Sequence, residues 1–361
     1  MKIAAFEVES WERVAFEQLA LDFDVRYTDR RLDLTNAADY ADAEVICTFI
    51  YSKLDKKVLS RFKNLRFICT RSTGFDHVDA AFCQAHNILV SNVPSYGDRT
   101  VAEHVFGLLL TISHQLYDAI DRTRKGDFSL VGLRGFQLYG RTLGVIGAGN
   151  IGLHVIRIAR GFGMRVLAYD VRPRPDLAVH IGFEYRPFED VLAAADVLTL
   201  HVPDTLETRD MIGHEQFARM KQGVVLINTA RGSIVNVQAL MEALAAGKVR
   251  AAGLDVLPEE PMMREEAELL HRAIRTEHDL ETLLADHILL RQRNVFVTPH
   301  SAFCTEEAVQ QILEVTRENI EAFARGAPQN VVIGDPAAPR GPAVPHDAGR
   351  EGEAEALPTR R

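Results

Sequence analysis

The chain has 361 residues, and its 41 basic (Lys, Arg) against 50 acidic (Asp, Glu) residues give a formal net charge of −9, which argues against binding to nucleic acid or to an anionic membrane. Hydrophobic residues make up 47% and charged residues 25% of it, which excludes disorder for the bulk of the chain, and its length predicts two globular domains. The four cysteines show no metal-ligand spacing, and we find no secretory leader and no apolar run long enough to span a membrane, so we expect a cytoplasmic protein without a metal site.

The first part of the chain alternates short apolar runs with polar, helix-compatible stretches, which predicts a parallel α/β domain. The expected strands cover residues 2–8, 43–50, 65–71 and 88–92. One long helical pattern follows over residues 100–125 and ends before Gly126. We expect this helix to connect two domains.

A second α/β series begins at Arg141 and contains enough strands for a doubly wound domain of its own. Its strands are expected at residues 142–147, 164–170, 196–202, 223–228, 250–256 and 294–299, with helices starting at Asn150 and Val237. A last amphipathic helix, residues 305–325, is expected to fold back on the first domain. The tail at 335–361 is rich in Pro, Gly, Ala and charge, which predicts disorder.

A glycine-rich turn marks the start of the second series. Residues 147–152 read Gly-Ala-Gly-Asn-Ile-Gly, which fits the G-x-G-x-x-G pattern between a strand and a helix, where backbone N–H groups can bind a pyrophosphate. The next strand ends in Asp170, about 20 residues further on, where a carboxylate can bind the ribose hydroxyls of NAD. Because Arg172 and Arg174 follow, NADP stays the less favoured alternative.

Three polar residues stand after later strands, where ligands bind in open α/β sheets: Arg231, Glu260 and His300. A guanidinium can hold a carboxylate in a bidentate pair, and an imidazole beside a carboxylate can exchange protons near neutral pH. Each residue alone is more often solvated or a helix cap, so the interpretation depends on the three together. As a set they indicate an acid/base pair with an anion clamp.

The chain resembles the D-isomer specific 2-hydroxyacid dehydrogenase family. The motifs that carry this resemblance spread over residues 1–330: RSTGFD at 71–76, VAEH at 101–104, GAGNIG at 147–152, NTARG at 228–232, GLDVLPEEP at 253–261 and TPHSA at 298–302. The stretch 122–142 and Phe303 are most similar to the D-lactate dehydrogenase branch.

The resemblance implies an architecture of two Rossmann-like doubly wound domains with a cleft between them. A flavodoxin-like substrate domain would comprise residues 1–99 plus 300–334, and the NAD-binding domain residues 100–299. The resemblance also implies a homodimer.

The implied reaction is the reversible, NAD-dependent reduction of a 2-oxoacid to a D-2-hydroxyacid. His300 would donate a proton to the substrate carbonyl oxygen, and Glu260 would keep the imidazole protonated and aligned. Arg231 would hold the substrate carboxylate, helped by backbone N–H groups of Thr73 and Gly74.

The same resemblance implies a set of cofactor contacts at the ends of the strands. These are Gly147, Gly149, Asn150, Ile151, Gly152, Asp170, Val202, Pro203, Thr208, Thr229, Ala230 and Asp255. Tyr51, Tyr96 and Phe303 are candidate walls of the substrate pocket, with burial in a core as the alternative.

Two departures from the common family pattern leave the substrate open. Gly97 and Asp98 follow Tyr96 where a Ser-Pro is usual, and residues 262–293 form a charged, helix-compatible insertion that could equally be a solvated surface segment. The alternatives to a pyruvate-like substrate are another substrate of the family, such as hydroxypyruvate, glyoxylate or phosphite, or a non-catalytic, NAD-sensing corepressor-like protein.

Overall fold

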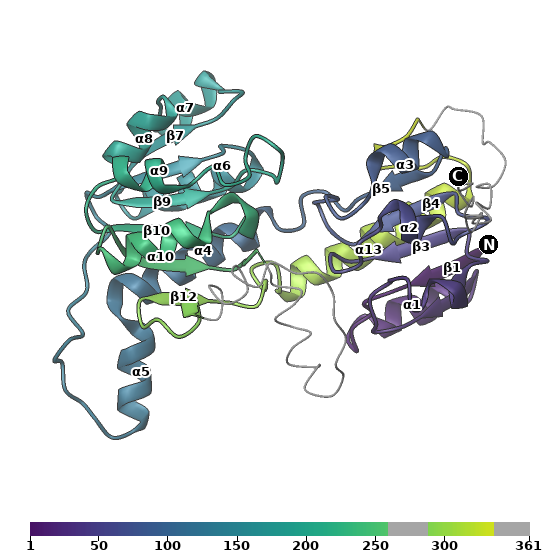
Figure 1. Ribbon diagram of the computed structural model, residues 1–361, viewed down its shortest axis with the longest axis horizontal. Helices are drawn as coiled ribbons and strands as arrows, with labels where there is room; N and C mark the ends of the chain where they lie inside the picture. Colours follow the sequence, from purple (N-terminus) through teal and green to yellow (C-terminus); the bar gives the residue numbers. More distant parts are fainter. Residues whose placement is uncertain (259–287, 336–361) are drawn as a thin grey trace, which may run out of the picture. The chain divides into compact units, whose positions relative to one another are not determined.

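The computed structural model describes residues 1–258 and 288–335, in two compact units (Figure 1). Unit 1 comprises Met1–Pro94 and the chain from Gln311, and unit 2 comprises Ser95–Gln310. Glu260, the insertion up to residue 287 and the tail from 336 lie outside the described residues.

Unit 1 is built on a six-stranded sheet in the order β13-β5-β4-β3-β1-β2. Its strands are parallel except β13, which pairs antiparallel with β5. The strands are β1 (Lys2–Ala5), β2 (Asp24–Tyr27), β3 (Val45–Thr48), β4 (Phe67–Thr70), β5 (Leu89–Ser91) and β13 (Val331–Ile333). All residues of β3 and β4 are buried, as expected for central parallel strands covered on both faces.

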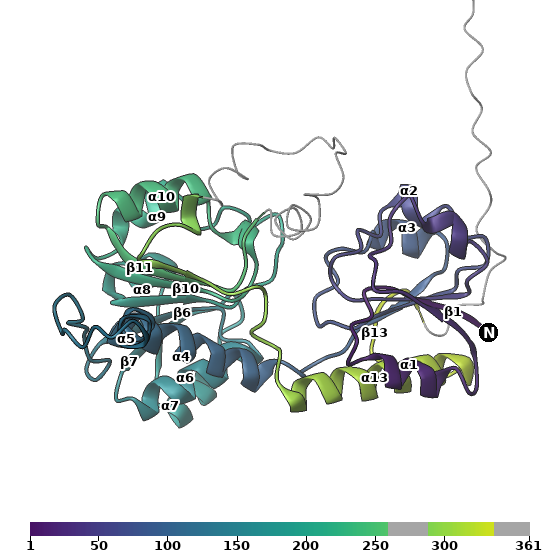
Figure 2. The same ribbon diagram turned by 90° about the horizontal axis from the view of Figure 1, so that it is seen from below.

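Helices cover both faces of this sheet. They are α1 (Arg13–Leu19), α2 (Lys56–Leu59), α3 (Ala80–Ala85) and α13 (Glu306–Ala324), with a 3₁₀ turn at Ala37–Tyr40. Figure 2 shows α1 and α13 on one face and α2 and α3 on the other. The side chains of Asp55 and Asp79 accept hydrogen bonds from backbone N–H groups and so define where α2 and α3 begin.

Unit 2 is built on a seven-stranded, wholly parallel sheet in the order β12-β11-β10-β9-β6-β7-β8. The strands are β6 (Thr142–Ile146), β7 (Arg165–Tyr169), β8 (Glu184–Tyr185), β9 (Val197–Leu200), β10 (Val224–Asn228), β11 (Val249–Leu254) and β12 (Val295–Val297). Chain order runs outward in both directions from the neighbours β6 and β9. In open α/β sheets this switch point is where ligands bind, beyond the carboxyl ends of the strands.

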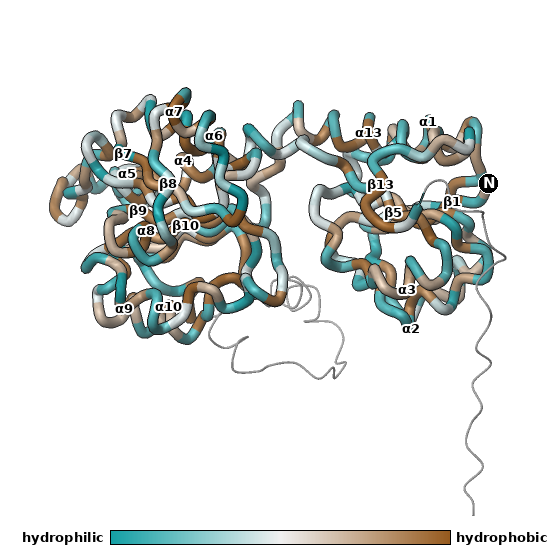
Figure 3. Tube along the Cα trace, turned by 90° about the horizontal axis from the view of Figure 1, so that it is seen from above, coloured by the Kyte–Doolittle hydropathy of each residue, from teal (hydrophilic) through white to brown (hydrophobic). Residues whose placement is uncertain are grey.

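Two apolar cores lie on the two faces of this sheet. One is formed with α8 (Phe188–Ala194), α9 (His214–Arg219) and α10 (Val237–Ala245), and the other with α4 (Asp98–His114), α6 (Asn150–Gly161) and α7 (Pro175–Ile181). A 3₁₀ turn follows β10 at Gly232–Ile234. In Figure 3 the hydrophobic colouring concentrates on the strands inside each unit. The predicted class, two Rossmann-like α/β domains, is confirmed.

The single helix predicted over residues 100–125 is wrong. The structure has two helices, α4 and α5 (Leu116–Arg124), because Gln115 between them adopts the left-handed conformation with φ of 54°. Its backbone N–H closes the end of α4 on the carbonyls of Thr111 and Ile112. The change of direction takes α5 off the core, and α5 has no buried residue.

The units also divide at different residues from the expected domains. Residues 95–99 and 300–310 belong to unit 2, whereas the sequence analysis assigned them to the substrate domain. Contacts within unit 2 account for this: the Tyr96 and Phe303 rings meet edge to face at 6.2 Å, and the Thr100 and Thr305 hydroxyls are 3.3 Å apart. Among the described residues, no helix is long and apolar enough to cross a membrane, and no cluster of potential metal ligands occurs.

Candidate active site

The glycine turn of unit 2 joins β6 to α6 and has the close packing that only glycine permits at two positions. Gly147 has a φ of 93°, and a Cβ there would lie 2.5 Å from the carbonyl oxygen of His201. A Cβ on Gly152 would lie 2.1 Å from the carbonyl oxygen of Gly147. A Cβ on Gly149, by contrast, would meet no protein atom within 4 Å. The backbone at Gly149, with Asn150 and Ile151 beginning α6, is therefore open to an anionic ligand.

Asp170 follows β7 and faces this turn. Its Oδ2 accepts a hydrogen bond from the Ala148 N–H at 2.8 Å, and its Oδ1 accepts one from the Arg172 N–H at 2.8 Å. The Arg174 guanidinium donates to the Ala148 carbonyl at 2.7 Å. The carboxylate thus lies beside the turn, where an adenosine ribose would bind, and one of the two nearby arginines is already engaged with the turn.

The segment after β9 packs under the glycine turn. His201 is partly buried, and its Nε2 lies 2.9 Å from the Thr199 hydroxyl. Burial lowers the pKa of His201 to about 3, so this imidazole is neutral at physiological pH. In the loop that follows, the Thr208 hydroxyl donates to the Pro203 carbonyl at 2.6 Å, and Val202 packs on the adjoining core.

The end of β10 presents Thr229, Ala230 and Arg231 in a turn organised by Asn228. The Asn228 side chain donates to the Arg231 carbonyl at 2.9 Å and accepts from the Ala230 N–H at 3.0 Å. Thr229 is 9% exposed, and its Oγ1 has no hydrogen-bond partner among the described residues. A buried hydroxyl without a partner is a candidate ligand contact. Arg231 is half-buried, and its Nη1 donates to the Ala230 carbonyl at 2.8 Å.

The ends of β11 and β12 are joined by one buried carboxylate. Asp255, 1% exposed, accepts hydrogen bonds from the Thr298 hydroxyl at 2.5 Å and from the backbone N–H groups of Ser301 and Ala302 at 2.9 Å each. His300 lies between these partners with φ of 52°, and its N–H is shared by the carbonyls of Asp255 and Thr298. This non-glycine residue is held in the left-handed conformation by the surrounding hydrogen bonds, an arrangement typical of functional sites.

Three further residues of unit 2 belong to the predicted motifs or the predicted substrate pocket. The His104 Nε2, from α4, lies 3.0 Å from the Thr298 hydroxyl and 3.5 Å from an Asp255 carboxylate oxygen. Tyr96 and Phe303, the expected walls of the substrate pocket, contact each other. Arg231, Asp255 and His300 thus follow three neighbouring parallel strands, β10, β11 and β12, and the third predicted catalytic residue, Glu260, lies outside the described residues.

The two substrate-loop residues of unit 1 follow β4. The Thr73 hydroxyl donates to the Val93 carbonyl at 2.9 Å, and the Asn92 side chain donates to the Thr73 carbonyl at 2.7 Å. The Ser72 hydroxyl donates to the Gly74 carbonyl at 2.7 Å. Among the described residues, the backbone N–H groups of Thr73 and Gly74 have no backbone acceptor, as an anion-binding loop requires.

Glu7 was not predicted as a site residue, and His104 was predicted only as part of the motif at residues 101–104. Glu7 lies two residues beyond the end of β1, but the predicted strand at residues 2–8 included it, so it did not stand out, as Arg231 did, as a charged residue beyond a strand end. His104 gave no such signal, because its partners Asp255 and Thr298 are far from it in the sequence.

The arrangement fits a dinucleotide. The open backbone at Gly149, the carboxylate of Asp170 beside the turn and the buried hydroxyl of Thr229, which has no partner in the part of the chain that the structure describes, suit a pyrophosphate, a ribose and a further polar group of the cofactor. His300 and Arg231 would supply a proton and an anion contact beside it.

Comparisons with known proteins agree with this geometry. Residues 106–302 match the model of the D-isomer specific 2-hydroxyacid dehydrogenase, NAD binding domain. The chain is 37% identical to a 2-hydroxyacid dehydrogenase homolog of Haemophilus influenzae, over 92% of this chain and 99% of that protein. It is 33% identical to the D-lactate dehydrogenase of Escherichia coli, over 90% of this chain and 98% of that protein. The crystal structure of D-lactate dehydrogenase from Aquifex aeolicus with NAD and lactic acid matches with a TM-score of 0.85 and 35% identity, covering 92% of this chain and 99% of that one.

Proposed function

The chain belongs to the D-isomer specific 2-hydroxyacid dehydrogenases, in the D-lactate dehydrogenase branch, and we propose that its substrate is pyruvate or a somewhat larger 2-oxoacid, reduced reversibly to the D-2-hydroxyacid. It is an NAD-dependent oxidoreductase. The observation that carries the proposal is the arrangement of His300, whose backbone is fixed by the buried Asp255, with Arg231 after the strand next to that of Asp255. This arrangement supplies a proton donor and an anion contact, which reduction of a 2-oxoacid requires.

The proton chemistry is assigned to His300. In the reductive direction its protonated imidazole donates to the substrate carbonyl oxygen, and in the oxidative direction the neutral ring accepts the hydroxyl proton. The chemistry supplied by bound NADH is hydride transfer to the carbonyl carbon. Asp255 holds the backbone directly after His300, and the role we propose for Glu260, from the family resemblance, is to keep the imidazole protonated and aligned.

Substrate binding is assigned to Arg231 and to the loop of unit 1. The guanidinium of Arg231 can pair with the substrate carboxylate, and the backbone N–H groups of Thr73 and Gly74 can add hydrogen bonds to it. Tyr96 and Phe303 are proposed to contact the side chain of the 2-oxoacid, since their rings meet in unit 2 close in sequence to His300. Two large aromatic rings favour a small or medium side chain.

We propose NAD rather than NADP as the preferred cofactor. Asp170 lies where the adenosine ribose would bind, and its negative charge would repel a 2′-phosphate. Arg174 donates to the Ala148 carbonyl, so its charge is directed at the turn. Arg172 contacts Asp170 through its backbone N–H.

We further propose that the protein is a homodimer that associates through α5 and the loop after it. Tyr117, Phe128, Leu130 and Val131 are large hydrophobic residues with exposed fractions of 65% to 83%. Exposed apolar patches of this kind mark interaction surfaces. In sedimentation velocity, wild type is expected to run as a dimer and Leu130→Glu as a monomer. A monomeric wild type at micromolar concentration would refute the homodimer.

The activity is tested by following the near-ultraviolet absorbance of NADH with pyruvate, 2-oxobutyrate, phenylpyruvate, hydroxypyruvate and glyoxylate, and again with NADPH. We expect rapid oxidation of NADH with pyruvate or 2-oxobutyrate. His300→Ala should lower the rate roughly 10²- to 10⁴-fold while NADH binding is kept. If wild type binds NADH but oxidises it with none of these acids, the proposed substrate class is wrong, and a non-catalytic NAD sensor becomes the better hypothesis.

A further inference from the structure

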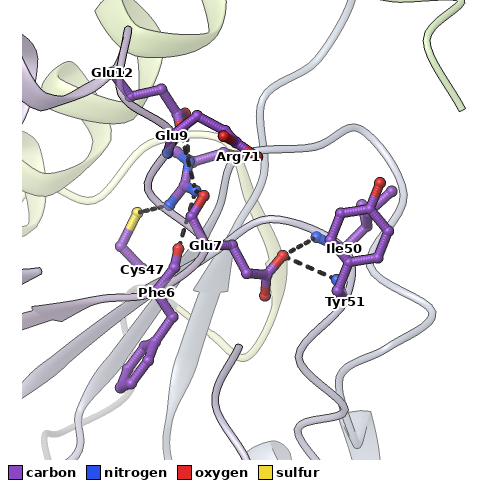
Figure 4. Close-up of polar contacts among 8 residues, drawn as sticks. All are labelled: Phe6, Glu7, Glu9, Glu12, Cys47, Ile50, Tyr51 and Arg71. Atoms are coloured by element: carbon purple, nitrogen blue, oxygen red, sulfur yellow. Dashed lines mark hydrogen bonds and ion pairs between the residues drawn. The ribbon is translucent and has the colours of Figure 1, made fainter. Parts of the chain in front are cut away.

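The sheet of unit 1 carries a buried charged network beyond the ends of β1, β3 and β4 that the proposed reaction does not use (Figure 4). At its centre is Arg71, which has no exposed surface. Its Nε donates to Oε1 of Glu12 at 3.0 Å, and its Nη2 donates to the backbone carbonyls of Phe6 and Glu7 at 3.0 and 2.6 Å. The guanidinium thus fixes the chain where it leaves β1. A buried charge of this kind is stable only because each side of it is paired.

Glu7 is held by this network on its backbone side and extends its carboxylate toward the end of β3. Its Oε2 accepts hydrogen bonds from the N–H groups of Ile50 and Tyr51 at 3.0 and 2.9 Å, and its Oε1 accepts from the Ser52 N–H at 2.8 Å and from the Ser52 hydroxyl. Figure 4 shows the carboxylate directed at Ile50 and Tyr51. Three successive N–H groups converging on one anion form a nest.

The backbone of Glu7 has a conformation that its residue type disfavours, so the carboxylate contacts outweigh the local conformational preference. Its φ is 59°, in the left-handed region that residues other than glycine rarely adopt, and the residue is only 8% exposed. Such a conformation persists only where the surroundings hold it. The four donors also select for a carboxylate, because an amide in its place would direct N–H groups at N–H groups.

The loop that Glu7 holds presents aromatic side chains. Phe49 and Tyr51 lie on either side of Ile50, and their rings contact each other at 6.0 Å and 73°. The neighbouring loop, which carries Thr73, starts at Arg71, whose N–H donates to the Thr48 carbonyl at 2.7 Å. One network therefore fixes both loops at the end of this sheet where parallel α/β domains bind ligands.

We propose that Glu7 is a positioning residue for substrate specificity: its carboxylate fixes the backbone of residues 50–52 and thereby the Phe49–Tyr51 ring pair that the substrate side chain meets. The inference deepens the proposed function and rests on it, because the ligand of this loop is the 2-oxoacid assigned above. Glu7 itself touches neither substrate nor cofactor.

The test compares Glu7→Gln with Glu44→Gln in the full-length protein. Glu44 directly precedes β3, at the amino end of the strands of the same sheet, where its carboxylate accepts a hydrogen bond from the Lys2 N–H at 3.1 Å. We expect Glu7→Gln to lower kcat/KM for pyruvate roughly 10- to 100-fold, mainly through KM, and to change the ratio of kcat/KM between pyruvate and phenylpyruvate. Glu7→Asp, which keeps the charge, should fall between wild type and Glu7→Gln. Glu44→Gln should match wild type.

Two measurements separate positioning from a general loss of structure. The dissociation constant of NADH, a property of unit 2, should be the same in all variants. Amide hydrogen exchange of residues 49–54 should be faster in Glu7→Gln, whereas exchange of β4 should match that of Glu44→Gln. Equal acceleration throughout unit 1 would assign Glu7 to general stability and overturn the proposal.

The remaining outcomes are also decisive. An unchanged substrate ratio in Glu7→Gln, or unchanged exchange in residues 49–54, overturns the proposal even if wild type is active. If wild type reduces none of the 2-oxoacids, the proposed function fails and the specificity role fails with it. The exchange measurement then still shows whether Glu7 fixes this loop.

Discussion

The partly buried His201, under the glycine turn, gives a quantitative prediction for stability. His201 lies at the end of β9, where its Nε2 contacts the Thr199 hydroxyl at 2.9 Å and burial lowers its pKa to about 3. In the unfolded chain the same side chain has an ordinary pKa of about 6.5. Between these two values the unfolded chain binds a proton that the folded protein excludes. The free energy of unfolding must therefore decrease as the pH falls below about 6.5.

The size of the effect follows from the two pKa values. Lowering the pH from about 7 to about 5 should reduce the free energy of unfolding of unit 2 by about 2 kcal/mol through His201 alone, or roughly 30-fold in the unfolding equilibrium. The pH interval from about 7 to about 5 lies above the titration of Asp196, another partly buried group of this unit. The pKa of its carboxyl is already lowered from 3.8, because hydrogen bonds from Thr142 and Lys221 outweigh its desolvation. The stability that the Asp196 carboxylate contributes is therefore lost only below this pH interval.

The measurement must report on unit 2. The only tryptophan, Trp11, lies in unit 1, so its fluorescence would follow the wrong unit. Amide hydrogen exchange of β6 and β9 at the two pH values, corrected for intrinsic exchange rates, gives the opening free energy of the unit. His201→Gln can keep the contact with Thr199 and should lose about 2 kcal/mol of the pH dependence. His180→Gln, at an exposed position of α7, should keep all of it. If the two variants show the same pH dependence, His201 does not stay neutral in the folded protein and the reasoning is refuted.

Three further predictions concern the cofactor site and the thiols. Gly152→Ala should destabilise the protein by about 1–3 kcal/mol in chemical denaturation, because its Cβ would lie 2.1 Å from the Gly147 oxygen, whereas Gly149→Ala should fold normally and weaken NADH binding in a fluorescence titration. Equal stability of the two variants would contradict the packing argument. Asp170→Asn should weaken NADH binding roughly 10- to 100-fold and lower the preference for NADH over NADPH, and an unchanged preference would exclude Asp170 as the selecting group. In the native protein only Cys304 of the four cysteines should react with a thiol reagent, since the other three are buried; reaction of a second thiol without denaturant would contradict this.

The strands of the central sheets could be predicted from the sequence because burial on both faces requires continuous apolar runs. β3 and β4, VICT and FICT, are wholly buried and were found as such. The glycine turn was equally accessible, because the tight contacts of Gly147 and Gly152 exclude any side chain there. Short or edge strands were missed: β8 has two residues, and β13 pairs only with β5.

Features that depend on contacts between distant residues could not be predicted. Gln115 is a residue type that ordinarily continues a helix, so nothing in the sequence indicated a break there. In the structure it has a left-handed φ of 54° and ends α4. Glu7 was missed because its partners at residues 50–52 lie more than 40 positions away. Arg231 and His300 were found because a polar residue at a strand end is visible locally, although the carboxylate of Asp255 that fixes the histidine loop is not visible in that role.

The same interaction, a carboxylate that accepts hydrogen bonds from the backbone of a loop, recurs at the strand ends of both units. Asp170 accepts a hydrogen bond from the backbone N–H of the glycine turn, Asp255 accepts from the two residues after His300, and Glu7 accepts from residues 50–52. In each case a carboxylate beyond a strand binds the backbone of a loop assigned to a ligand, so the loop is fixed before the ligand arrives. Fixing the loop in advance removes the entropy that binding would otherwise have to supply. Replacing these carboxylates by amides should therefore weaken ligand binding and turnover more than it weakens the fold, in contrast to Glu12, whose carboxylate pairs with the buried Arg71 inside the unit.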